Sequence, residues 1–582
     1  MNFYDLKTNL KKDFSNLKKV KVALLGDSAT QLLVKALKGY SYEVGYNFDI
    51  FEADYDQIEM QTYDLESELY EFKAEYVIIY HSTEKLLKKF YQLGNTDKTL
   101  FANRQIEEVS NLYRTITNKS KCKVIYFNFV ETDDSVFGNY ANKTASSYLY
   151  QVRKINYELM NLSQKHKNLF INDVASLHNT LGAAFCTDPK IYITTDLIFS
   201  LDFLPVVAKN IADIILSIAG TMKKCVILDL DNTLWGGIIG DDGMENIQIG
   251  ELGIGKSFTA LQMWLKQLKQ RGIILTVCSK NDETIAKEPF EKHPDMILRL
   301  SDIAVFVANW DNKVQNINYI QSILNIGFDS MVFLDDNPFE RNMAKTHIPD
   351  ITVPDLPEDP AEYLYYLRSC NLFETASFTP EDEQRTRQYQ EEAQRIIVQK
   401  QCINEDEFLL SLNMHSVVKS FDKFSIPRVS QLTQRSNQFN LRTIRYTEEE
   451  ISAIANSADY ITIDFTLEDK YGDYGLISVI ILKKQSDSLF IDTWIMSCRV
   501  LKRGMEKFVL NRITEHARKI GVKEIKGEYL PTPKNGMVKE HYLDLGFTRC
   551  DGENNLWLLN VESYSDYPTF IAVKMADTKE PV

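Results

Sequence analysis

The first part of the chain alternates short apolar runs with longer amphipathic segments. The apolar runs are Lys21 to Leu25, Tyr76 to Tyr80, Lys123 to Phe127 and Leu169 to Ile171. Strands that alternate with helix-length segments form parallel sheets covered by helices on both faces. The pattern therefore predicts an α/β domain over residues 1–221.

The same pattern begins again at Cys225 and predicts a second α/β domain over residues 222–360. Its expected strands are Cys225 to Leu230, Ile273 to Cys278 and Met331 to Leu334. A helix is expected from Ala260 to Arg271, because Gly272 follows as a stop signal. Three prolines, at positions 354, 357 and 360, mark the end of this domain.

The remaining residues divide into two regions with different sequence patterns. Residues 361–415 are predicted to be a helical connector, with a highly charged helix over 381–401. Residues 416–582 are predicted to be an α+β domain. It has strands at Tyr460 to Phe465, Gly475 to Leu482 and Leu489 to Met496, and a helix from about 504 to 520. The expected fold class is multidomain α/β.

Composition and charge limit the number of domains, the partners and the compartment that we expect for the protein. The 582 residues exceed what one hydrophobic core can organise, and the formal net charge is −15. An acidic chain gains nothing from counterion release, which argues against nucleic acid as a partner. Neither a secretory signal nor a membrane-inserted segment is predicted. The eight cysteines form no CxxC pair, so we expect reduced thiols in a cytoplasmic protein.

Carboxylates follow two of the strands expected in the second domain. Asp229 and Asp231 stand at the end of the first strand, and Asp335 with Asp336 follows a later one. Ligands of open α/β sheets bind beyond the carboxyl ends of the strands, so these groups should share one site. Carboxylates suit Mg2+ and can attack phosphorus, which predicts a phosphorylated substrate.

Two further side chains fit the same chemistry. Ser279 follows the strand ending at Cys278 and can donate to a phosphoryl oxygen, and Lys313 can neutralise developing charge. Each piece alone has an ordinary structural explanation, since a DxD sequence is often a turn and a lone lysine usually lies on the surface. The ordered set favours a catalytic site.

These four motifs resemble those of the haloacid dehalogenase (HAD) superfamily. The stretches DLDNTLWGGIIGDDG, VCSKN, NWDNKVQNI and FLDDNPFER, beginning at residues 229, 277, 309 and 333, look like its FkbH-like branch. The resemblance implies a HAD-type Rossmann-like sheet with Asp229 as nucleophile and Asp231 as general acid and base. It also implies that Ser279 and Lys313 bind phosphate. The metal would be held by Asp229, Asp335, Asp336 and the backbone carbonyl of Asp231.

The resemblance further implies a reaction and a partner. Members of this branch are associated with taking a glyceryl unit from 1,3-bisphosphoglycerate, releasing phosphate, and loading the unit on an acyl carrier protein. Such proteins occur in secondary-metabolite or surface-polysaccharide biosynthesis. The gaps between the motifs have no room for a large cap domain, and an open site suits a protein-borne substrate. The alternatives are a phosphatase acting on a sugar or acyl phosphate, and a nonenzymatic scaffold.

Cys278 directly precedes the motif serine. In this family a cysteine at that position has been proposed to carry the acyl group as a thioester. Successive side chains of a strand point to opposite faces, so Cys278 should point away from the site that Ser279 faces. The alternative is a cysteine packed in the core.

The flanking domains resemble two other families. Gly26-Asp27-Ser28 is similar to the first block of SGNH hydrolases, but Asp196 to Phe199 lacks the expected histidine. This implies a degenerate domain in which Ser28 caps a helix. The sequence MSCRVLKRGME, from 496 to 506, resembles the phosphate-binding loop of GNAT acyltransferases. It implies binding of CoA or phosphopantetheine by Arg499, Lys502 and Gly504.

Overall fold

The structure is a computed structural model of the chain. It describes residues 1–379, 386–391, 395, 404–497, 500–550 and 555–574. The chain divides into two compact units, Met1–Leu216 and Ser217–Val582. Most of the helix predicted over 381–401 lies outside the described residues, and the residue ranges of the four domains given above remain predictions. Among the described residues, none of the helices has the length and apolar character needed to cross a membrane.

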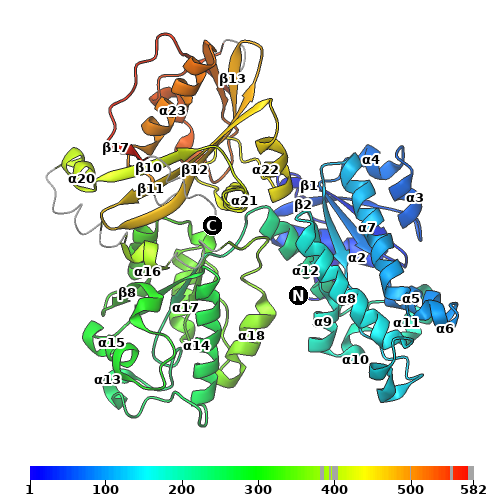
Figure 1. The fold of residues 1–582 in the computed structure, drawn as a ribbon. Helices are drawn as coiled ribbons and strands as arrows, with labels where there is room; N and C mark the ends of the chain where they lie inside the picture. Colours follow the sequence, from blue (N-terminus) through cyan, green and yellow to red (C-terminus); the bar gives the residue numbers. More distant parts are fainter. Residues whose placement is uncertain (380–385, 392–394, 396–403, 498–499, 551–554, 575–582) are drawn as a thin grey trace. The chain divides into compact units, whose positions relative to one another are not determined.

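Unit 1 contains a parallel sheet with strand order β2-β1-β3-β4-β5 (Figure 1). The strands are β1 (Lys18–Gly26), β2 (Tyr46–Glu52), β3 (Tyr76–Tyr80), β4 (Lys123–Phe127) and β5 (Leu169–Asn172). The helices are α1 (Phe3–Asn9), α2 (Gln31–Glu43), α3 (Ile58–Tyr63), α4 (Glu68–Phe72), α5 (Thr83–Tyr91), α6 (Asn95–Lys98), α7 (Phe101–Lys119), α8 (Tyr148–Lys165), α9 (Val174–Leu181), α10 (Ala183–Cys186), α11 (Pro189–Thr195) and α12 (Leu204–Ile218).

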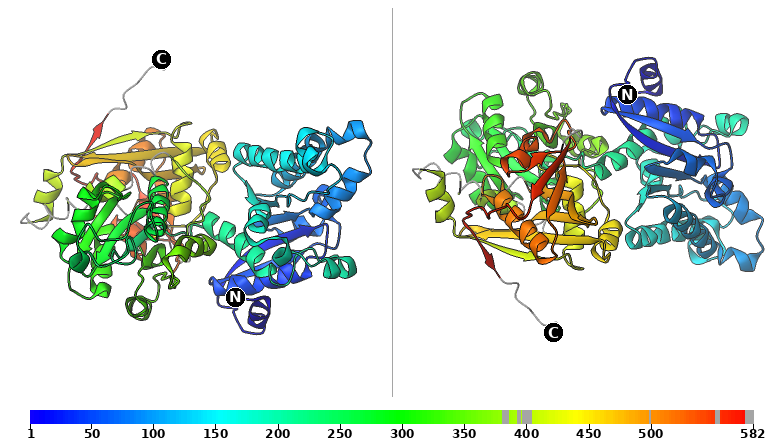
Figure 2. Two further views of the ribbon diagram at one scale, coloured as in Figure 1. Left: turned by 90° about the horizontal axis from the view of Figure 1, so that it is seen from below. Right: turned by 90° about the horizontal axis from the view of Figure 1, so that it is seen from above.

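Helices pack on both faces of this sheet (Figure 2). On one face, alternate residues of β1, β3 and β4 join a buried cluster with apolar side chains of α5, α7 and α8. The residues between them, such as Leu24 and Ile78, are also fully buried. A strand buried on both faces reads as a continuous apolar run, which explains why β3 and β4 match their predicted bounds.

Unit 2 begins with a second parallel sheet, of strand order β8-β7-β6-β9. Its strands are β6 (Cys225–Leu228), β7 (Ile274–Ser279), β8 (Ile303–Ala308) and β9 (Met331–Leu334). Its helices are α13 (Ile239–Asp242), α14 (Gly255–Gln270), α15 (Glu283–Lys292), α16 (Lys313–Leu324), α17 (Pro338–His347) and α18 (Tyr363–Cys370). Helices α14 and α15 pack on one face and α16 and α17 on the other, so the sheet has the HAD-type layered arrangement.

The rest of unit 2 is built on an eight-stranded mixed sheet, in the order β15-β16-β14-β13-β12-β11-β10-β17. Its strands are β10 (Met414–Lys419), β11 (Tyr460–Asp469), β12 (Gly472–Lys484), β13 (Ser488–Met496), β14 (Glu524–Glu528), β15 (Thr548–Arg549), β16 (Leu556–Asn560) and β17 (Ile571–Lys574). Its helices are α20 (Glu405–Ser411), α21 (Ile426–Arg435), α22 (Glu448–Ala455), α23 (Met505–Lys519) and α24 (His541–Asp544). This region is therefore an α+β fold, as predicted for residues 416–582.

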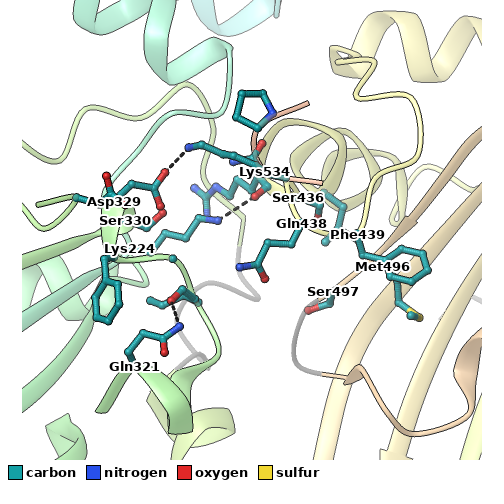
Figure 3. Close-up of a pocket in the computed structure, with 18 of the residues that line it drawn as sticks. Lys224, Gln321, Asp329, Ser330, Ser436, Gln438, Phe439, Met496, Ser497 and Lys534 are labelled. Atoms are coloured by element: carbon teal, nitrogen blue, oxygen red, sulfur yellow. Dashed lines mark hydrogen bonds and ion pairs between the residues drawn. The ribbon is translucent and has the colours of Figure 1, made fainter. Parts of the chain in front are cut away.

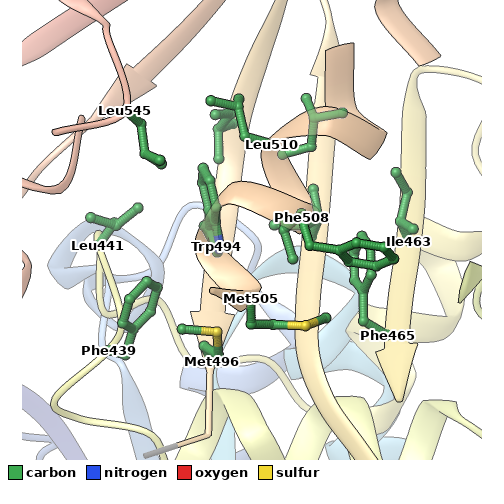
Figure 4. Packing of buried hydrophobic residues seen from close by; sticks show 14 of the residues in the cluster. Phe439, Leu441, Ile463, Phe465, Trp494, Met496, Met505, Phe508, Leu510 and Leu545 are labelled. Carbon is green, nitrogen blue, oxygen red and sulfur yellow. The ribbon is translucent and has the colours of Figure 1, made fainter. Parts of the chain in front are cut away.

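Two parallel strands of this sheet separate part of the way along their length. Strands β13 and β14 pair only from Ser488 to Ile491 on β13. Beyond that point the segment 439–441 lies against β13, because Met496 N donates to Phe439 O and Leu441 N donates to Trp494 O. Leu530 N donates to Leu441 O on the other side. Phe439 and Leu441 thereby join Trp494 and Leu545 in the core (Figure 4).

Candidate active site

Acidic side chains from two adjacent strands meet at the carboxyl edge of the β6–β9 sheet. Strands β6 and β9 run parallel with Leu228 opposite Leu334, so the next residues, Asp229 and Asp335, emerge side by side. Carboxylate oxygens of Asp229, Asp335 and Asp336 all lie within 4.8 Å of one another. Hard divalent cations prefer oxygen ligands, so this acidic trio is suited to hold one.

Lys313 provides the positive charge beside these carboxylates. Its Nζ lies 2.8 Å from Oδ2 of Asp229 and 2.6 Å from Oδ2 of Asp335, and the lysine is 4% exposed. Burial disfavours the charged lysine, but the two carboxylates outweigh this cost and hold the pKa of Lys313 above its usual value. Burial and the charge of Asp229 raise the pKa of Asp335, although the ammonium group of Lys313 opposes the shift.

Helix caps fix where these side chains sit. Asn312 Oδ1 accepts a hydrogen bond from Val314 N and so begins α16 with Lys313 in its first turn. Asn337 caps α17 in the same way, and its own N–H donates to Asp335 Oδ1 at 2.9 Å. Arg341 donates from Nη1 to the backbone oxygens of both Asp335 and Asp336. The short loop after β9 is therefore held from two directions.

Asp231 has a different environment from the acidic trio. Its Oδ1 accepts from Trp235 Nε1 and Ile239 N, both at 3.0 Å, and its Oδ2 accepts from Asn281 Nδ2 at 3.2 Å. Burial and the nearby charge of Asp229 raise the pKa of Asp231. Its carboxylate is not a member of the acidic trio, so the predicted metal ligand at this position would be its backbone carbonyl. A hydrogen-bonded carboxyl beside the trio is placed to exchange a proton.

Ser279 and Cys278 stand at the end of β7. Ser279 is the last residue of the strand and is 1% exposed. Cys278 packs with Ile274 in the cluster that α16 and α17 cover, and its Sγ lies 3.8 Å from Lys313 O. Burial raises the pKa of the Cys278 thiol to about 12. A buried thiol that keeps its proton is a poor nucleophile, and the thioester role of Cys278 remains a prediction.

Four further residues support the site but had no assigned role in the sequence analysis. Trp235 and Asn281 hold the carboxylate of Asp231, and Arg341 holds the loop after β9. Thr233 Oγ1 accepts from Asp336 N at 3.2 Å. All four lie within the quoted motif stretches, so their place in those motifs could have indicated that they belong to the site.

The site has no inserted cap in the chain segments that surround it. Between Thr233 and Ser279 the described residues form α13, α14 and β7, and between Ser279 and Lys313 they form α15 and β8. Large apolar side chains are nevertheless exposed in the segments that follow three strands. Ile238 is 45% exposed, Trp310 77% and Phe339 64%. All three follow carboxyl ends of strands of the same sheet.

The predicted serine of unit 1 does not cap a helix. Helix α2 begins after Thr30, which occupies the N-cap position, whereas Ser28 lies two residues earlier. Ser28 is only 4% exposed, in the turn between β1 and α2. The prediction that Ser28 is a cap is therefore wrong, because the turn is longer than the sequence suggested.

The GNAT-like loop lies beside a cavity of about 1060 Å3. Lys502 and Gly504 line it and adopt left-handed backbone conformations, with φ of 62° and 74°. Gly504 is the N-cap of α23, so the positive end of a 15-residue helix faces the same region. The third predicted residue, Arg499, lies outside the described residues.

A different cavity, of about 560 Å3, lies at the amino-terminal edge of the β6–β9 sheet (Figure 3). Lys224 and Ser330, which precede β6 and β9, line it together with Gln438 and Lys534. Lys534 pairs with Asp329, and Lys224 Nζ donates to Arg435 O. Although burial opposes the effect, Lys534 and Lys224 hold the pKa of Asp329 below its usual value. These charges connect the two sheets of unit 2, away from the acidic trio.

Comparison with known proteins identifies relatives of the chain. The family described as "FkbH, N-terminal domain" matches residues 21–216. The N-terminal part of the protein BF1531 from Bacteroides fragilis, described as containing a phosphatase domain complexed with Mg, is 53% identical. The match covers 65% of this chain and 100% of that chain, with a TM-score of 0.63.

Solved acetyltransferases are similar to a smaller part of the chain. The ribosomal-protein-S18-alanine N-acetyltransferase of Escherichia coli is 14% identical, with 25% of this chain and 94% of that chain covered and a TM-score of 0.20. The spermidine N-acetyltransferase of Vibrio cholerae, in complex with CoA and spermine, is 11% identical, with 25% and 96% covered and a TM-score of 0.20. No curated protein matches the chain significantly. With its FkbH N-terminal region and its 53% identity over the full length of the BF1531 structure, the chain belongs to the FkbH-like family.

Proposed function

We propose that the site at the carboxyl edge of the β6–β9 sheet is a Mg2+-dependent, HAD-type phosphoryl-handling centre. The observation that carries this proposal is the convergence of Asp229, Asp335 and Asp336 beside Lys313. The related structure from Bacteroides fragilis, complexed with Mg, supports it.

The donor set fits magnesium. The acidic trio offers carboxylate oxygens, and Mg2+ is commonly held by one or two carboxylates together with phosphate oxygens. We propose that the backbone carbonyl of Asp231 adds a further oxygen. The bound ion would supply positive charge that draws the phosphate group to the carboxylates and stabilises charge on its oxygens.

The side chains of the site can carry out phosphate removal in two steps. Asp229 attacks phosphorus, the bond from phosphorus to the leaving oxygen breaks, and Asp231 gives that oxygen a proton. Water then attacks the phosphorus of the aspartyl phosphate, Asp231 takes its proton, the bond from phosphorus to the Asp229 oxygen breaks, and inorganic phosphate leaves. Lys313 and Ser279 bind the phosphoryl oxygens in both steps.

For an acyl phosphate donor we propose transfer of the acyl group to the thiol of an acyl carrier protein. The thiol sulfur attacks the acyl carbon, the bond between that carbon and the bridging oxygen breaks, and inorganic phosphate leaves with the oxygen. Asp231 takes the thiol proton, and Lys313 and Ser279 hold the leaving phosphate. A glyceryl or similar three-carbon unit is the proposed cargo, for secondary-metabolite or surface-polysaccharide biosynthesis.

Two features support a protein-borne acceptor. The described residues around the site form no cap, so a long arm can reach the carboxylates. Ile238, Trp310 and Phe339 expose apolar surface at the same edge of the sheet, and exposed apolar patches often mark protein interaction sites. The region around Lys502 and Gly504 would then hold the pantetheine arm of the carrier or of CoA, with its phosphate at the start of α23.

Intact-mass measurement tests the transfer. The protein would be incubated with Mg2+, 1,3-bisphosphoglycerate and candidate carrier proteins, and a carrier that gains the mass of one glyceryl unit is the expected result. Trp310→Ala should lower the transfer rate while leaving the hydrolysis of p-nitrophenyl phosphate unchanged. If no carrier gains mass but phosphate is still released, the enzyme is a phosphatase.

Isotope labelling distinguishes phosphate hydrolysis from acyl transfer, because the two reactions break different bonds of the donor. In 18O-labelled water, hydrolysis through Asp229 places the label in inorganic phosphate, whereas acyl transfer leaves the phosphate unlabelled. Cys278→Ala should retain both reactions, since a buried thiol that keeps its proton is a poor nucleophile. An acyl-enzyme that is trapped in the wild type but lost in Cys278→Ala would instead restore the thioester hypothesis.

A further inference from the structure

Unit 1 contains a cavity of about 370 Å3 at the carboxyl edge of its own sheet. Its lining includes Tyr80 at the end of β3, Asn128 directly after β4 and Val174 at the start of α9, after β5. Open α/β sheets bind ligands at this edge, and the volume falls within the usual range for small-molecule sites. Nothing in the chemistry proposed for unit 2 uses this cavity.

Aromatic rings form much of the wall of this cavity. The ring of Tyr80 stacks on that of Phe199, with centroids 5.1 Å apart and an angle of 30° between the planes. Tyr192 lines the cavity as well, together with the apolar side chains of Val130 and Ile198. Flat aromatic faces bind apolar groups and also attract cations.

The charged lining residues of the cavity are all acidic. Glu84, Glu131 and Asp188 line it, and the described lining residues include neither lysine nor arginine. Glu131 pairs with Arg153 Nε at 2.9 Å, and the carboxylate of Asp188 accepts from Lys190 N and Ile191 N at the start of α11. Two of the three acidic groups are therefore already occupied by the protein.

Glu84 is the third acidic group, and it differs from the others. Its Oε2 is buried and has no hydrogen-bond partner among the described residues. The adjacent Lys85 pairs instead with Asp56 at 2.8 Å. Leaving a buried carboxylate oxygen without a partner is costly, so such groups need an explanation. Burial and the charge of Asp27 raise the pKa of Glu84, and a bound cation would relieve both effects.

The two histidines of the lining do not supply that cation. His81 Nδ1 lies 2.8 Å from Tyr126 Oη, and burial lowers the pKa of His81 to about 3. Burial also lowers the pKa of His178. Both rings are therefore neutral at pH 7 and place no positive charge beside Glu84.

We propose that this cavity binds a small organic amine, with its ammonium group on Glu84 and its apolar part against Tyr80, Phe199 and Tyr192. An ammonium group donates up to three hydrogen bonds, and a rotation of the Glu84 side chain would turn its buried Oε2 toward such a donor. The aromatic faces then serve both the apolar part and the charge. Unit 1 would thus be a ligand-binding module for amines.

Three probes of one shape test the proposal on the full-length protein. 2-Phenylethylamine, 2-phenylethanol and 3-phenylpropionate carry a positive, a neutral and a negative head group, and their binding would be measured by calorimetry. The amine should bind at least about 10-fold more tightly than the alcohol, which corresponds to one charge-assisted contact. The acid should not bind measurably, because the lining already carries three carboxyl groups.

Matched variants locate the binding. Glu84→Gln should reduce the affinity for the amine to that for the alcohol, whereas Glu131→Gln should leave it within about twofold, since Arg153 already pairs with Glu131. Ala183→Trp, at an exposed part of the lining, should block both probes. The melting transition of residues 1–216 without ligand shows that each variant is folded.

Three results would overturn the proposal. One is an amine that binds no better than the alcohol. Another is an affinity for the amine that Glu84→Gln or Ala183→Trp leaves unchanged, which would place the binding elsewhere. The third is the absence of amine binding up to about 10 mM, because a built site for this group should bind more tightly than that.

Discussion

At the scale of single residues, the candidate site depends on one lysine that compensates two buried acids. The Nζ of Lys313 lies within 2.8 Å of Asp229 and Asp335, both of which are at least nine-tenths buried. Removing one partner of a buried ion pair is costly because the remaining charge keeps its desolvation penalty. The same ammonium group is placed to meet phosphate oxygens, so Lys313 contributes both to folding and to the proposed chemistry.

Lys313→Met should therefore lose activity and stability together. We expect the rate with p-nitrophenyl phosphate and Mg2+ to fall about 100-fold or more. The free energy of unfolding without metal should fall by about 3 kcal/mol, since two carboxylates then face each other uncompensated. Urea unfolding and steady-state kinetics measure these changes. Lys345→Met, which removes an exposed ion pair with Asp355, is the control and should change the free energy of unfolding by less than about 1 kcal/mol. A Lys313→Met variant as active as the control would contradict the proposed role.

A second residue, Asp464 in β11, predicts how stability depends on pH. Asp464 is fully buried, and burial raises its pKa to about 7. The folded state thus holds a proton that the unfolded state releases near pH 4, so this group lowers stability progressively from about pH 4 to pH 7. Asp464→Asn should remove that loss and raise the free energy of unfolding at pH 8 by roughly 2–4 kcal/mol, with little gain at pH 4.5. Thermal unfolding at both pH values measures the difference, with the exposed Asp459→Asn as control. A gain that is equal at both pH values would exclude this assignment.

At the scale of elements, the sequence predicted strands that are apolar along their whole length and missed strands that contain polar or partly exposed positions. Strands β3, β4 and β9 match their predicted bounds, because double burial produces an uninterrupted apolar run. Strand β2 was missed because it is an edge strand in which only Phe48 is fully buried. Strand β14 was missed because its sequence, EIKGE, is mostly polar. Strand β8 is different: its run IAVFVA carried the signal, and the sequence analysis did not assign it.

Strand β14 also contains a close approach that no residue but glycine accommodates. A Cβ on Gly527 would lie 2.3 Å from Cζ of Tyr542, whose side chain is buried. Gly527→Ala should therefore destabilise unit 2 by about 2 kcal/mol, because the ring has no space into which to move. Gly536→Ala is the matched control, since nothing lies within 4 Å of its added Cβ. Adding Tyr542→Leu to Gly527→Ala should recover part of the stability, and thermal unfolding of the four proteins tests this. Equal melting temperatures for Gly527→Ala and Gly536→Ala would exclude the clash.

At the scale of the whole molecule, the sequence predicted the carboxylates of the site better than the residues that hold them in place. The order of strands in a parallel sheet brings Asp229 and Asp335 together, so their proximity followed from the motif positions. The hydrogen bonds to Asp231 come from Trp235 and Ile239 in the segment after β6 and from Asn281 after β7, and no spacing rule predicts them. The sequence also could not predict the unpartnered oxygen of Glu84, because that feature depends on which atoms surround a buried carboxylate.

The division into two compact units predicts that each proposed ligand stabilises only the unit that binds it. A ligand that binds the folded form alone adds about 2.7 kcal/mol of stability at 100 times its dissociation constant. Mg2+ should raise the melting transition of residues 217–582, where the acidic trio lies, and 2-phenylethylamine that of residues 1–216. Calorimetry of the full chain resolves the transitions, and limited proteolysis during the melt assigns each to its unit. Asp335→Asn should abolish the shift by Mg2+ and keep the shift by the amine, whereas Glu84→Gln should do the reverse. If Mg2+ raised both transitions equally, the units would unfold as one, and the two sites could not act independently.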